Sequence, residues 1–270
     1  MSGLKTRHYR AVLTGAAGGI GQHFALALAP ECSAMLLVGR DGDKLAALRQ
    51  RLQVAYPDSS IELVAADLGT DAGRTAVFEA AKMLPGGANL LVNNAGVSDF
   101  HAFAGQNSAV TESLLTTNLL SPILLCQKFI PLLLAQKEAQ IVNVGSVFGD
   151  IGYPGFAVYC ASKFGLRGFT QALRRELSDS SLRVRYFAPR ATRTGLNTSA
   201  VNAMNAELNT QSDEPKAVAA AFMDFLASNQ NERILGWPER FYVVLNRLRS
   251  QITDKAIGKQ LAVIKRHLPS

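Results

Sequence analysis

The stretch Thr14-Gly15-Ala16-Ala17-Gly18-Gly19-Ile20-Gly21 follows an aliphatic run at 10–13 and precedes a helical pattern. Glycines at such a point allow a tight turn and let the backbone approach a pyrophosphate, which then lies at the helix N-terminus among free N–H groups. An ordinary glycine-rich turn is the alternative, but the position between an opening strand and an opening helix favours a phosphate loop. The residues that we expect to contact a dinucleotide cofactor here are Gly15, Gly18, Gly19, Ile20 and Gly21.

The rest of the chain alternates between short aliphatic runs and longer amphipathic segments, such as 43–56 and 71–84. This alternation predicts an α/β fold, a doubly wound parallel sheet of the Rossmann type with helices on both faces. We expect one domain at 1–238 and a basic, amphipathic helical extension of the same domain at 239–270. The expected strands are 10–15, 34–40, 61–67, 89–96, 140–146 and 182–189, with a seventh at 233–237.

The composition narrows the class of protein. Of the 270 residues, 48% are hydrophobic and 18% are charged, which is typical of a globular protein. The N-terminal residues lack the apolar core of a signal peptide, and no apolar stretch approaches the ~20 residues of a transmembrane helix. Cys32, Cys126 and Cys160 are scattered, as are the four histidines, which predicts no metal site and a reducing, cytoplasmic setting.

The glycine spacing resembles the TGxxxGxG fingerprint of the short-chain dehydrogenase/reductase family, in its single-domain branch. Asn93-Asn94-Ala95-Gly96 is similar to the NNAG motif of that family, which supports the sheet beneath the cofactor. Asp67-Leu68 resembles the family's adenine contact, although Asp67 could equally be a helix N-cap. The resemblance therefore implies cofactor contacts by Asp67, Leu68, Asn94, Ala95 and Gly96.

Strand 34–40 ends in Val38-Gly39-Arg40. In Rossmann sites an acidic residue at this point holds the ribose 2′-hydroxyl of NAD, whereas an arginine accommodates the 2′-phosphate of NADP. A guanidinium binds a phosphate in bidentate fashion, and Gly39 stands where the acid would be. Arg40 thus favours NADP(H) over NAD(H), and the alternative is that Arg40 is only a solvated surface residue.

Tyr159 and Lys163 are four residues apart in Tyr159-Cys160-Ala161-Ser162-Lys163, so a helix places phenol and ammonium on one face. The positive charge of Lys163, with that of an oxidised nicotinamide, is expected to lower the pKa of Tyr159. The spacing resembles the YxxxK motif of the family. Ser146, thirteen residues earlier, and Asn118 match its catalytic serine and its helix asparagine, and the resemblance covers about residues 9–195.

The resemblance implies a hydride transfer between the nicotinamide and a carbonyl or secondary alcohol. Tyr159 is the expected acid/base, Ser146 the hydrogen-bond donor to the carbonyl oxygen, and Asn118 part of a water relay to Lys163, which also holds the nicotinamide ribose. We expect a reductase of an apolar ketone or 3-oxoacyl-like substrate. A non-catalytic NADP(H)-binding redox sensor is the alternative, although it would have no need for the proton relay. A sugar-nucleotide epimerase would need a larger substrate domain.

The segment after strand 182–189 departs from the family pattern. There the family reads PG followed by a threonine, whereas this chain has Arg190 after Pro189. Either the loop takes another path, or Arg190 presents a charge near the nicotinamide or substrate. The cofactor contacts expected in this loop are Pro189, Thr192 and Thr194.

Aromatic and aliphatic residues are frequent in the loops expected over the nicotinamide, which predicts a largely apolar substrate pocket. His101 is the polar residue among them that could recognise a substrate group, and lid packing is the alternative role for the aromatic residues. The residues concerned are Phe100, His101, Phe103, Phe148, Ile151, Tyr153 and Phe156.

The net charge of +7 is concentrated in the tail, since residues 239–270 contain seven basic and two acidic residues. The body of the chain therefore gives no indication of nucleic-acid binding. Apolar residues at near-helical spacing in the tail predict a basic amphipathic helix. This helix could bind a membrane surface or an acidic carrier, or it could pack on its own domain or a subunit interface of a dimeric or tetrameric homo-oligomer.

Overall fold

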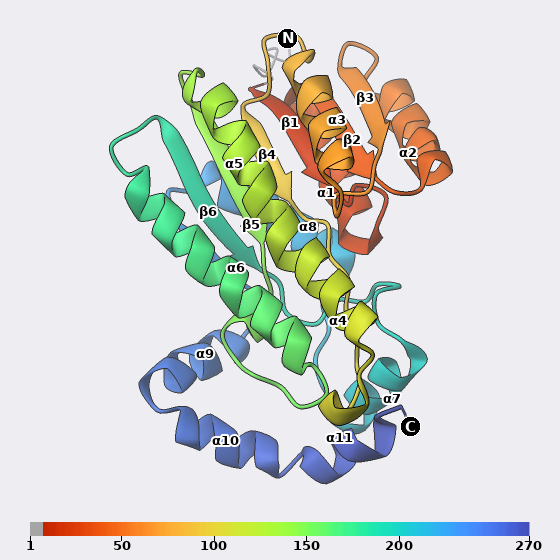
Figure 1. The fold of residues 1–270 in the computed structure, drawn as a ribbon, viewed down its shortest axis with the longest axis vertical. Helices are drawn as coiled ribbons and strands as arrows, with labels where there is room; N and C mark the ends of the chain where they lie inside the picture. Colours follow the sequence, from red (N-terminus) through yellow and green to blue (C-terminus); the bar gives the residue numbers. More distant parts are fainter. Residues whose placement is uncertain (1–7, 270) are drawn as a thin grey trace, which may run out of the picture.

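The computed structural model describes residues 8–269, and seven parallel strands form its central sheet in the order β3-β2-β1-β4-β5-β6-β7 (Figure 1). The order reverses between β1 and β4, as in Rossmann-type sheets, so the predicted fold class is confirmed. The seventh strand is shorter than predicted because the chain turns at Gly236, where φ is 96°. The strands are β1 (Tyr9–Thr14), β2 (Cys32–Gly39), β3 (Ser60–Ala65), β4 (Leu90–Asn93), β5 (Ala139–Val144), β6 (Leu182–Ala188) and β7 (Glu232–Ile234).

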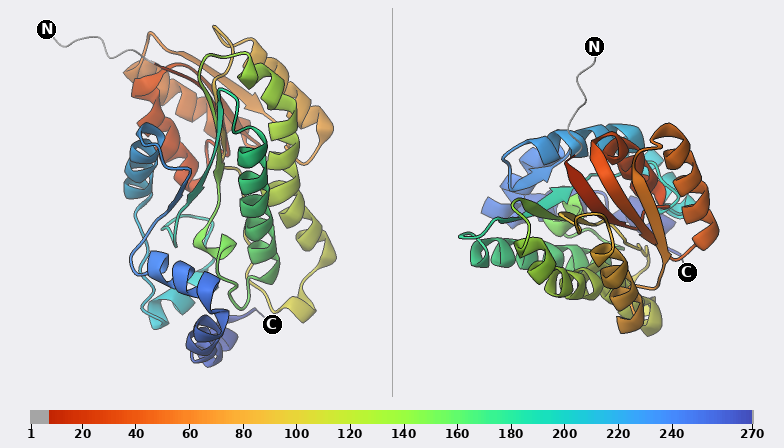
Figure 2. Two further views of the ribbon diagram at one scale, coloured as in Figure 1. Left: turned by 90° about the vertical axis from the view of Figure 1, so that its left-hand side faces the viewer. Right: turned by 90° about the horizontal axis from the view of Figure 1, so that it is seen from above.

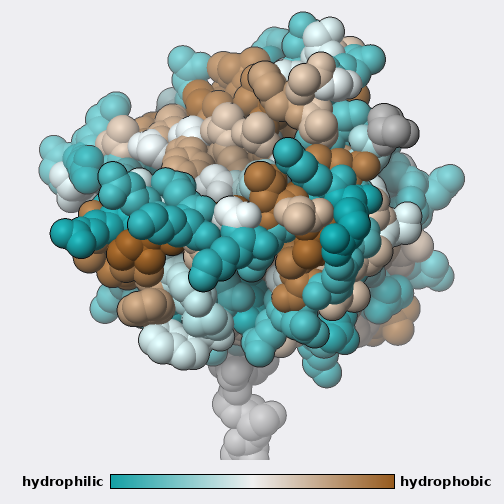
Figure 3. All heavy atoms as spheres, turned by 90° about the horizontal axis from the view of Figure 1, so that it is seen from below, coloured by the Kyte–Doolittle hydropathy of each residue, from teal (hydrophilic) through white to brown (hydrophobic). Residues whose placement is uncertain are grey.

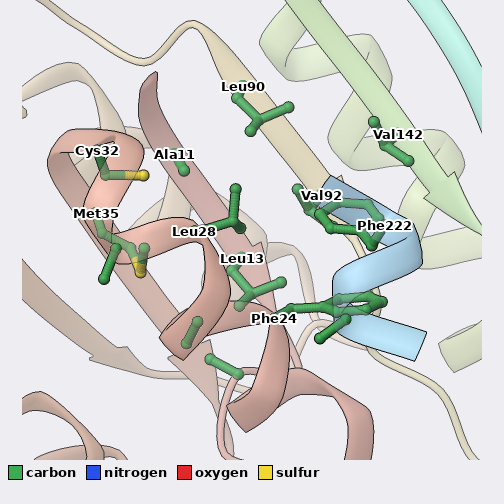
Figure 4. Close-up of a cluster of buried hydrophobic side chains, with 14 of the residues drawn as sticks. Ala11, Leu13, Phe24, Leu28, Cys32, Met35, Leu90, Val92, Val142 and Phe222 are labelled. Atoms are coloured by element: carbon green, nitrogen blue, oxygen red, sulfur yellow. The ribbon is translucent and has the colours of Figure 1, made fainter. Parts of the chain in front are cut away.

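Helices cover both faces of the sheet (Figure 2). Side chains of successive strand residues point to opposite faces, and both faces here carry apolar side chains that need covering. Leu13 of β1 contributes to the core with α1, α2 and α8, whereas Val12 contributes to the core with α3, α5 and α6. Figure 4 shows the first core, in which Phe24 of α1 stacks on Phe222 of α8 with ring centroids 4.3 Å apart. These helices are α1 (Gly19–Leu28), α2 (Gly42–Ala55), α3 (Asp71–Lys82), α5 (Ser121–Leu134), α6 (Ala157–Glu176) and α8 (Pro215–Ala227).

One helical run is longer than the sequence suggested. Helix α4 (Ser108–Leu115), a π-helical turn at Thr116–Leu120 and α5 follow one another without a break. The run Ser108–Leu134 is 27 residues long and apolar enough to cross a membrane by length and composition, so the prediction that no such stretch exists is wrong. Phe129 and Leu133 of this run are fully buried in the core under the sheet. We therefore assign it to the protein core.

The tail folds into three short helices rather than one. They are α9 (Glu239–Leu248), α10 (Ser250–Gly258) and α11 (Leu261–His267). The helix breaks at Arg249, whose φ of −152° and ψ of 81° lie outside the helical region. Val243 of α9 and Ile264 of α11 are fully buried. The tail therefore packs across one end of the molecule, beneath α6 and beside α7 (Ser199–Glu207) (Figure 1).

Candidate active site

The carboxyl ends of the parallel strands meet at one edge of the sheet, and every residue predicted for the site follows a strand there or lies on a helix beside it. The glycine loop follows β1, Arg40 follows β2, and Asp67 follows β3. The Asn94–Gly96 segment follows β4, Ser146 follows β5, and the Pro189–Thr194 segment follows β6. Asn118 is contributed by the π-helical turn, and Tyr159 and Lys163 by α6.

The glycine loop has the geometry of a phosphate-binding turn. Gly15 adopts φ of +63°, and a Cβ on Gly21 would lie 2.0 Å from the Gly15 carbonyl oxygen, so neither position accommodates a side chain. Helix α1 begins at Gly19, and no side chain of the described residues caps its N-terminus. Its first N–H groups are therefore available to an anion. Thr194 lies against this loop, close to Gly19.

The segment after β4 is tied to the glycine loop. The Thr14 hydroxyl accepts hydrogen bonds from the backbone N–H groups of Asn94 and Ala95, at 2.9 and 3.0 Å. The Asn94 side chain donates to the carbonyl oxygens of Thr14 and Gly15, at 3.0 and 3.2 Å. Because both segments are held to each other, the floor of the predicted cofactor site is one connected unit.

Asp67 does not cap a helix, so that alternative is wrong. Thr70 is the N-cap of α3 and accepts a hydrogen bond from the Gly73 N–H, whereas Asp67 accepts from the Gly69 N–H in the preceding turn. The Asp67 side chain is exposed at the edge of the site. The neighbouring Leu68 has its side chain in the core, and its carbonyl oxygen accepts from Arg74 and Ser121.

Arg40 is exposed directly after β2, and no ion pair joins it to another of residues 8–269. A Cβ on Gly39 would meet only the Leu45 side chain, at an ordinary contact distance of 3.5 Å. Packing would therefore allow an acidic residue at position 39. The absence of a carboxylate there, beside a free guanidinium, is an electrostatic feature of the site and not a steric necessity.

Asn118 occupies the π-helical turn and is almost fully buried. Its side-chain oxygen accepts from the Val97 N–H, and its amide donates to the Val97 carbonyl oxygen, both at 2.9 Å. The amide also donates to Ser162 at 3.2 Å, and Ser162 in turn donates to the Tyr159 carbonyl oxygen. These hydrogen bonds connect the turn to the helix that carries Tyr159 and Lys163.

Tyr159 and Lys163 are close together, with the Lys163 Nζ 5.7 Å from the Tyr159 ring centroid. Burial lowers the pKa of Lys163 to about 8, and its ammonium donates to the Val144 carbonyl oxygen at 3.1 Å. Burial also raises the pKa of Tyr159 to about 12, against a smaller opposite effect of its hydrogen bond with Ser146. The expected lowering by Lys163 is therefore wrong for the protein alone, because desolvation dominates and the ammonium is directed at Val144.

The buried charge of Lys163 gives a stability prediction. Its pKa is 10.5 when exposed and about 8 in the folded protein, so folding favours the neutral amine and stability rises with pH between these values. Below the lower value the cost is constant and amounts to at most about 3 kcal/mol. We expect Lys163→Met to be more stable than the wild type near pH 7, and this difference to shrink by about pH 9.5. Urea unfolding at both pH values measures it, and a variant that is less stable near pH 7 would contradict it.

Residues that sequence reasoning missed lie beneath the Ser146 loop. Tyr186 of β6 is fully buried, and a Cβ on Gly145 would lie 2.0 Å from its ring. Its hydroxyl is 3.4 Å from the Ser146 N and 3.5 Å from the Ser146 carbonyl oxygen. Ser146 accepts from the Phe148 N–H at 3.1 Å, which starts a short 3₁₀ helix at Val147–Gly149. The glycines on both sides of Ser146 were the only signal of this close packing in the sequence.

Asp150, just after this 3₁₀ helix, has a fully buried carboxylate that holds two arginines. Arg167 of α6 is 3.1 Å from Oδ1, and Arg247 of α9 donates to the same oxygen at 3.0 and 2.7 Å. Asn246 of α9 donates to the Asp150 carbonyl oxygen at 2.8 Å, and Arg167 also pairs with Glu232. The tail thus contacts the loop that carries Ser146 through charged groups that no sequence pattern indicated.

Arg190 does not present a free charge to the site. Its guanidinium is 2.8 Å from Asp213 and 3.1 Å from Glu239, and its side chain is only 14% exposed. The nearby Thr192 donates to the Arg190 carbonyl oxygen and is buried. Pro189 accepts from the Val147 N–H through its carbonyl oxygen, at 3.1 Å. The arginine therefore joins the loop after β6 to the first residue of α9.

The aromatic residues of the loops form a cluster against Tyr159, with Ile264 and Leu268 of the tail at its border. The backbone N–H of His101 donates a hydrogen bond to the Gly155 carbonyl oxygen, with an N–O distance of 2.9 Å. Phe103 is 68% exposed and lies outside the cluster, and Ile151 packs instead with Val147 and Val243. The members near Tyr159 are Phe100, Phe148, Tyr153 and Phe156. The tail therefore adds part of the apolar surroundings of the site.

The three cysteines lie inside the protein, since Cys32, Cys126 and Cys160 are all buried. Within residues 8–269 there is no group of three or more histidine, cysteine or acidic side chains that could hold a metal ion.

Known proteins similar to this chain include a protein family, curated sequences and solved structures. The short chain dehydrogenase family model matches residues 9–205. An acetoacetyl-CoA reductase from Acinetobacter sp. is 31% identical over 233 residues, which are 84% of this chain and 93% of that protein. A short-chain dehydrogenase from Sphingobium yanoikuyae, solved with NADPH, has 27% identity and a TM-score of 0.76, covering 90% of this chain and 95% of that one. A short chain dehydrogenase/reductase from Burkholderia phymatum, solved with NAD, has a similar fold with 23% identity and a TM-score of 0.82, covering 92% of this chain and 96% of that one.

Proposed function

The chain is an oxidoreductase of the short-chain dehydrogenase/reductase family, and we propose that it reduces an apolar ketone or 3-oxoacyl-like substrate with NADPH. The observation that carries this proposal is the position of Tyr159, hydrogen-bonded to Ser146 and beside Lys163, at the strand ends next to the glycine loop. The phenol and hydroxyl are partly buried and the ammonium is buried, and the three groups together suit proton transfer at a carbonyl oxygen.

In this proposal the protein residues position and protonate the substrate. The bound nicotinamide would supply the hydride. Ser146 donates a hydrogen bond to the substrate oxygen and Tyr159 transfers its proton to the same oxygen. The proton of Tyr159, whose pKa is about 12, is retained until the substrate oxygen becomes basic enough to take it. Lys163 and Asn118 complete the route by which the phenol regains its proton.

The cofactor fits the residues present. The uncapped N-terminus of α1 and the side-chain-free glycine loop suit a pyrophosphate. Asp67 is exposed where an adenine would lie, and Asn94, Ala95 and Gly96 line the floor. Gly96 lies close to Asn118 and Lys163, so a nicotinamide ribose placed there would be within reach of the ammonium.

Arg40 is proposed to set the preference for NADP(H). Replacing it with alanine should weaken NADPH binding by about tenfold to a hundredfold, the effect of losing a hydrogen bond to a charged group. NADH binding should stay nearly unchanged, since NADH has no 2′-phosphate. Titration of both cofactors into both proteins measures this, with Arg51→Ala on the nearby α2 as the control. Equal affinity of the wild type for NADH and NADPH would contradict the assignment.

The substrate class can be tested by following NADPH oxidation with ketones, aldehydes, quinones and 3-oxoacyl thioesters. The apolar cluster of Phe100, Phe148, Tyr153 and Phe156 beside Tyr159 supports an apolar substrate, and the acetoacetyl-CoA reductase relative supports a thioester. We expect turnover with an apolar ketone or a 3-oxoacyl thioester. If NADPH binds but is not oxidised in any class, the protein is the redox sensor instead.

We also propose a cytoplasmic location and a homo-oligomer. Cys126 and Cys160 are free thiols, which suits a reducing compartment. Leu120 and Leu134 at the two ends of α5 and Phe164 of α6 are each about 40–50% exposed and offer an apolar surface to a second copy. The mass in solution, from sedimentation equilibrium, distinguishes an oligomer from a monomer.

A further inference from the structure

Helix α9 has an inner and an outer face, and its apolar face is the outer one. The inner face contacts the domain through Val243, Asn246 and Arg247. A surface helix ordinarily buries its apolar face. Here five apolar side chains of the tail and the segment just before it point to solvent, and each is between 43% and 77% exposed. They are Trp237, just before α9, Phe241, Val244 and Leu248 of α9, and Ile252 of α10. We call these five residues the outer face of the tail.

The residues of the outer face are contiguous. At 100° per residue, Phe241, Val244 and Leu248 lie within one narrow stripe of the helix, on the side away from Val243. The rings of Trp237 and Phe241 are in contact, with centroids 6.3 Å apart. Figure 3 shows this end of the molecule from below, where apolar patches lie among hydrophilic side chains. The stripe has no covering group among residues 8–269.

Basic residues surround the outer face and are not neutralised. Arg240, Arg249, Lys255 and Lys259 are exposed, and none forms an ion pair with another described residue. Of the two acidic residues of the tail, Glu239 is engaged by Arg190, which leaves only Asp254 nearby. The outer face therefore combines an apolar stripe with an uncompensated positive border.

We infer that the outer face of the tail docks the protein on an anionic lipid membrane. Apolar side chains would enter the boundary between head groups and acyl chains, while the basic border contacts anionic head groups. Tryptophan and tyrosine side chains favour this boundary. Trp237 and Tyr242, which both contact the Phe241 ring, provide one of each at this surface. Helices α9–α11 project from one end of the molecule, which lets them meet a flat surface (Figure 2).

A second copy of the chain fits this surface less well. A two-fold interface places the same patch on both subunits. The four unpaired basic residues of one subunit would then face the same four of the other, with only Asp254 in each tail to offset their charge. A membrane with anionic lipids supplies the opposite charge. The docking does not depend on the proposed reductase activity, because none of the five outer residues lies in the candidate active site.

Trp237 allows a direct test because it is the only tryptophan of the chain. Purified full-length protein is mixed with phosphatidylcholine vesicles with and without 30% phosphatidylglycerol, and binding is measured by co-sedimentation and by Trp237 emission. We expect a blue shift of Trp237 emission and sedimentation with the anionic vesicles at low salt. With neutral vesicles or at high salt, binding should be weaker by about tenfold or more.

Two variants separate the apolar from the basic part. Phe241→Ser with Leu248→Ser should weaken binding by about tenfold or more, and Arg240→Gln with Arg249→Gln and Lys255→Gln by about a hundredfold. The matched control is Val54→Ser with Met83→Ser, which removes apolar residues of α2 and after α3 that are even more exposed, and it should leave binding unchanged. A thermal unfolding midpoint equal to that of the wild type verifies that each variant folds.

Three outcomes would overturn the inference. The first is a wild-type protein that does not bind anionic vesicles. The second is a serine double variant that binds as tightly as the wild type, which would mean that charge alone attracts the protein. The third is a wild-type oligomer that the serine variant dissociates, with no vesicle binding, which would make a second copy the occupant of the outer face.

Discussion

Tyr159→Phe should lower kcat by several orders of magnitude while NADPH still binds. The substitution keeps the ring within the aromatic cluster but removes the only proton that the proposal transfers to the substrate oxygen. The proton cannot be replaced by a neighbour, because Ser146 only donates a hydrogen bond and the Lys163 ammonium is directed at the Val144 carbonyl oxygen. Steady-state kinetics with the best substrate of the screen, with NADPH titration alongside, measures both quantities.

The control for this variant is Tyr153→Phe, a second tyrosine of the same cluster. Its hydroxyl donates to Gln260 in the tail at 2.9 Å and has no role in the proposed reaction. We expect it to change kcat by less than about tenfold, since only one side-chain hydrogen bond is lost. Near-normal kcat in Tyr159→Phe would exclude Tyr159 as the acid, whatever the behaviour of the control.

Asp150→Ala should lower the free energy of unfolding by about 3 kcal/mol or more, the effect of breaking a buried ion pair. The carboxylate is fully buried and accepts from Arg247, with Arg167 3.1 Å away. Its loss leaves two guanidinium groups facing each other with only Glu232 between them. Because Asp150 ends the loop that carries Ser146, we also expect a lower kcat.

Arg193→Ala is the matched control for Asp150→Ala. It breaks the ion pair with Glu214, in which both side chains are more than 60% exposed. Such exposed pairs contribute about 1 kcal/mol or less. Denaturant unfolding of both variants compares them, and a loss in Asp150→Ala no larger than that in Arg193→Ala would mean that the buried carboxylate is not important for stability.

Sequence patterns predicted the sheet and the position of the site because both depend on local signals. Aliphatic runs followed by glycine, asparagine, aspartate or proline define the strands, and the carboxyl ends of parallel strands necessarily share one edge. The positions of the glycine loop, Asn94 and Ser146 follow from that rule, and those of Tyr159 and Lys163 follow from their spacing of four on the next helix. Their proximity could therefore be expected before any distance was known, whereas their roles in catalysis remain predictions.

What the sequence could not give depends on contacts between distant segments. Asp150 pairs with Arg247 across 97 positions, and Tyr186 lies beneath Gly145 from another strand. Neither contact leaves a periodic trace in the sequence. The pKa of Tyr159 in the protein alone is raised for the same kind of reason, since the pattern shows the spacing to Lys163 but not the burial that dominates.

The arginine in the loop after β6 also has a consequence for how this chain diverged from its relatives. Without Glu239, the largely buried Arg190 would keep only its ion pair with Asp213, and Glu239 at the start of α9 would lack its partner beside a loop glycine. Each replacement alone is unfavourable, so the two should have been fixed together in one lineage. Among homologous sequences we therefore expect position 190 to covary with position 239, with arginine and acid inherited as a pair and absent as a pair.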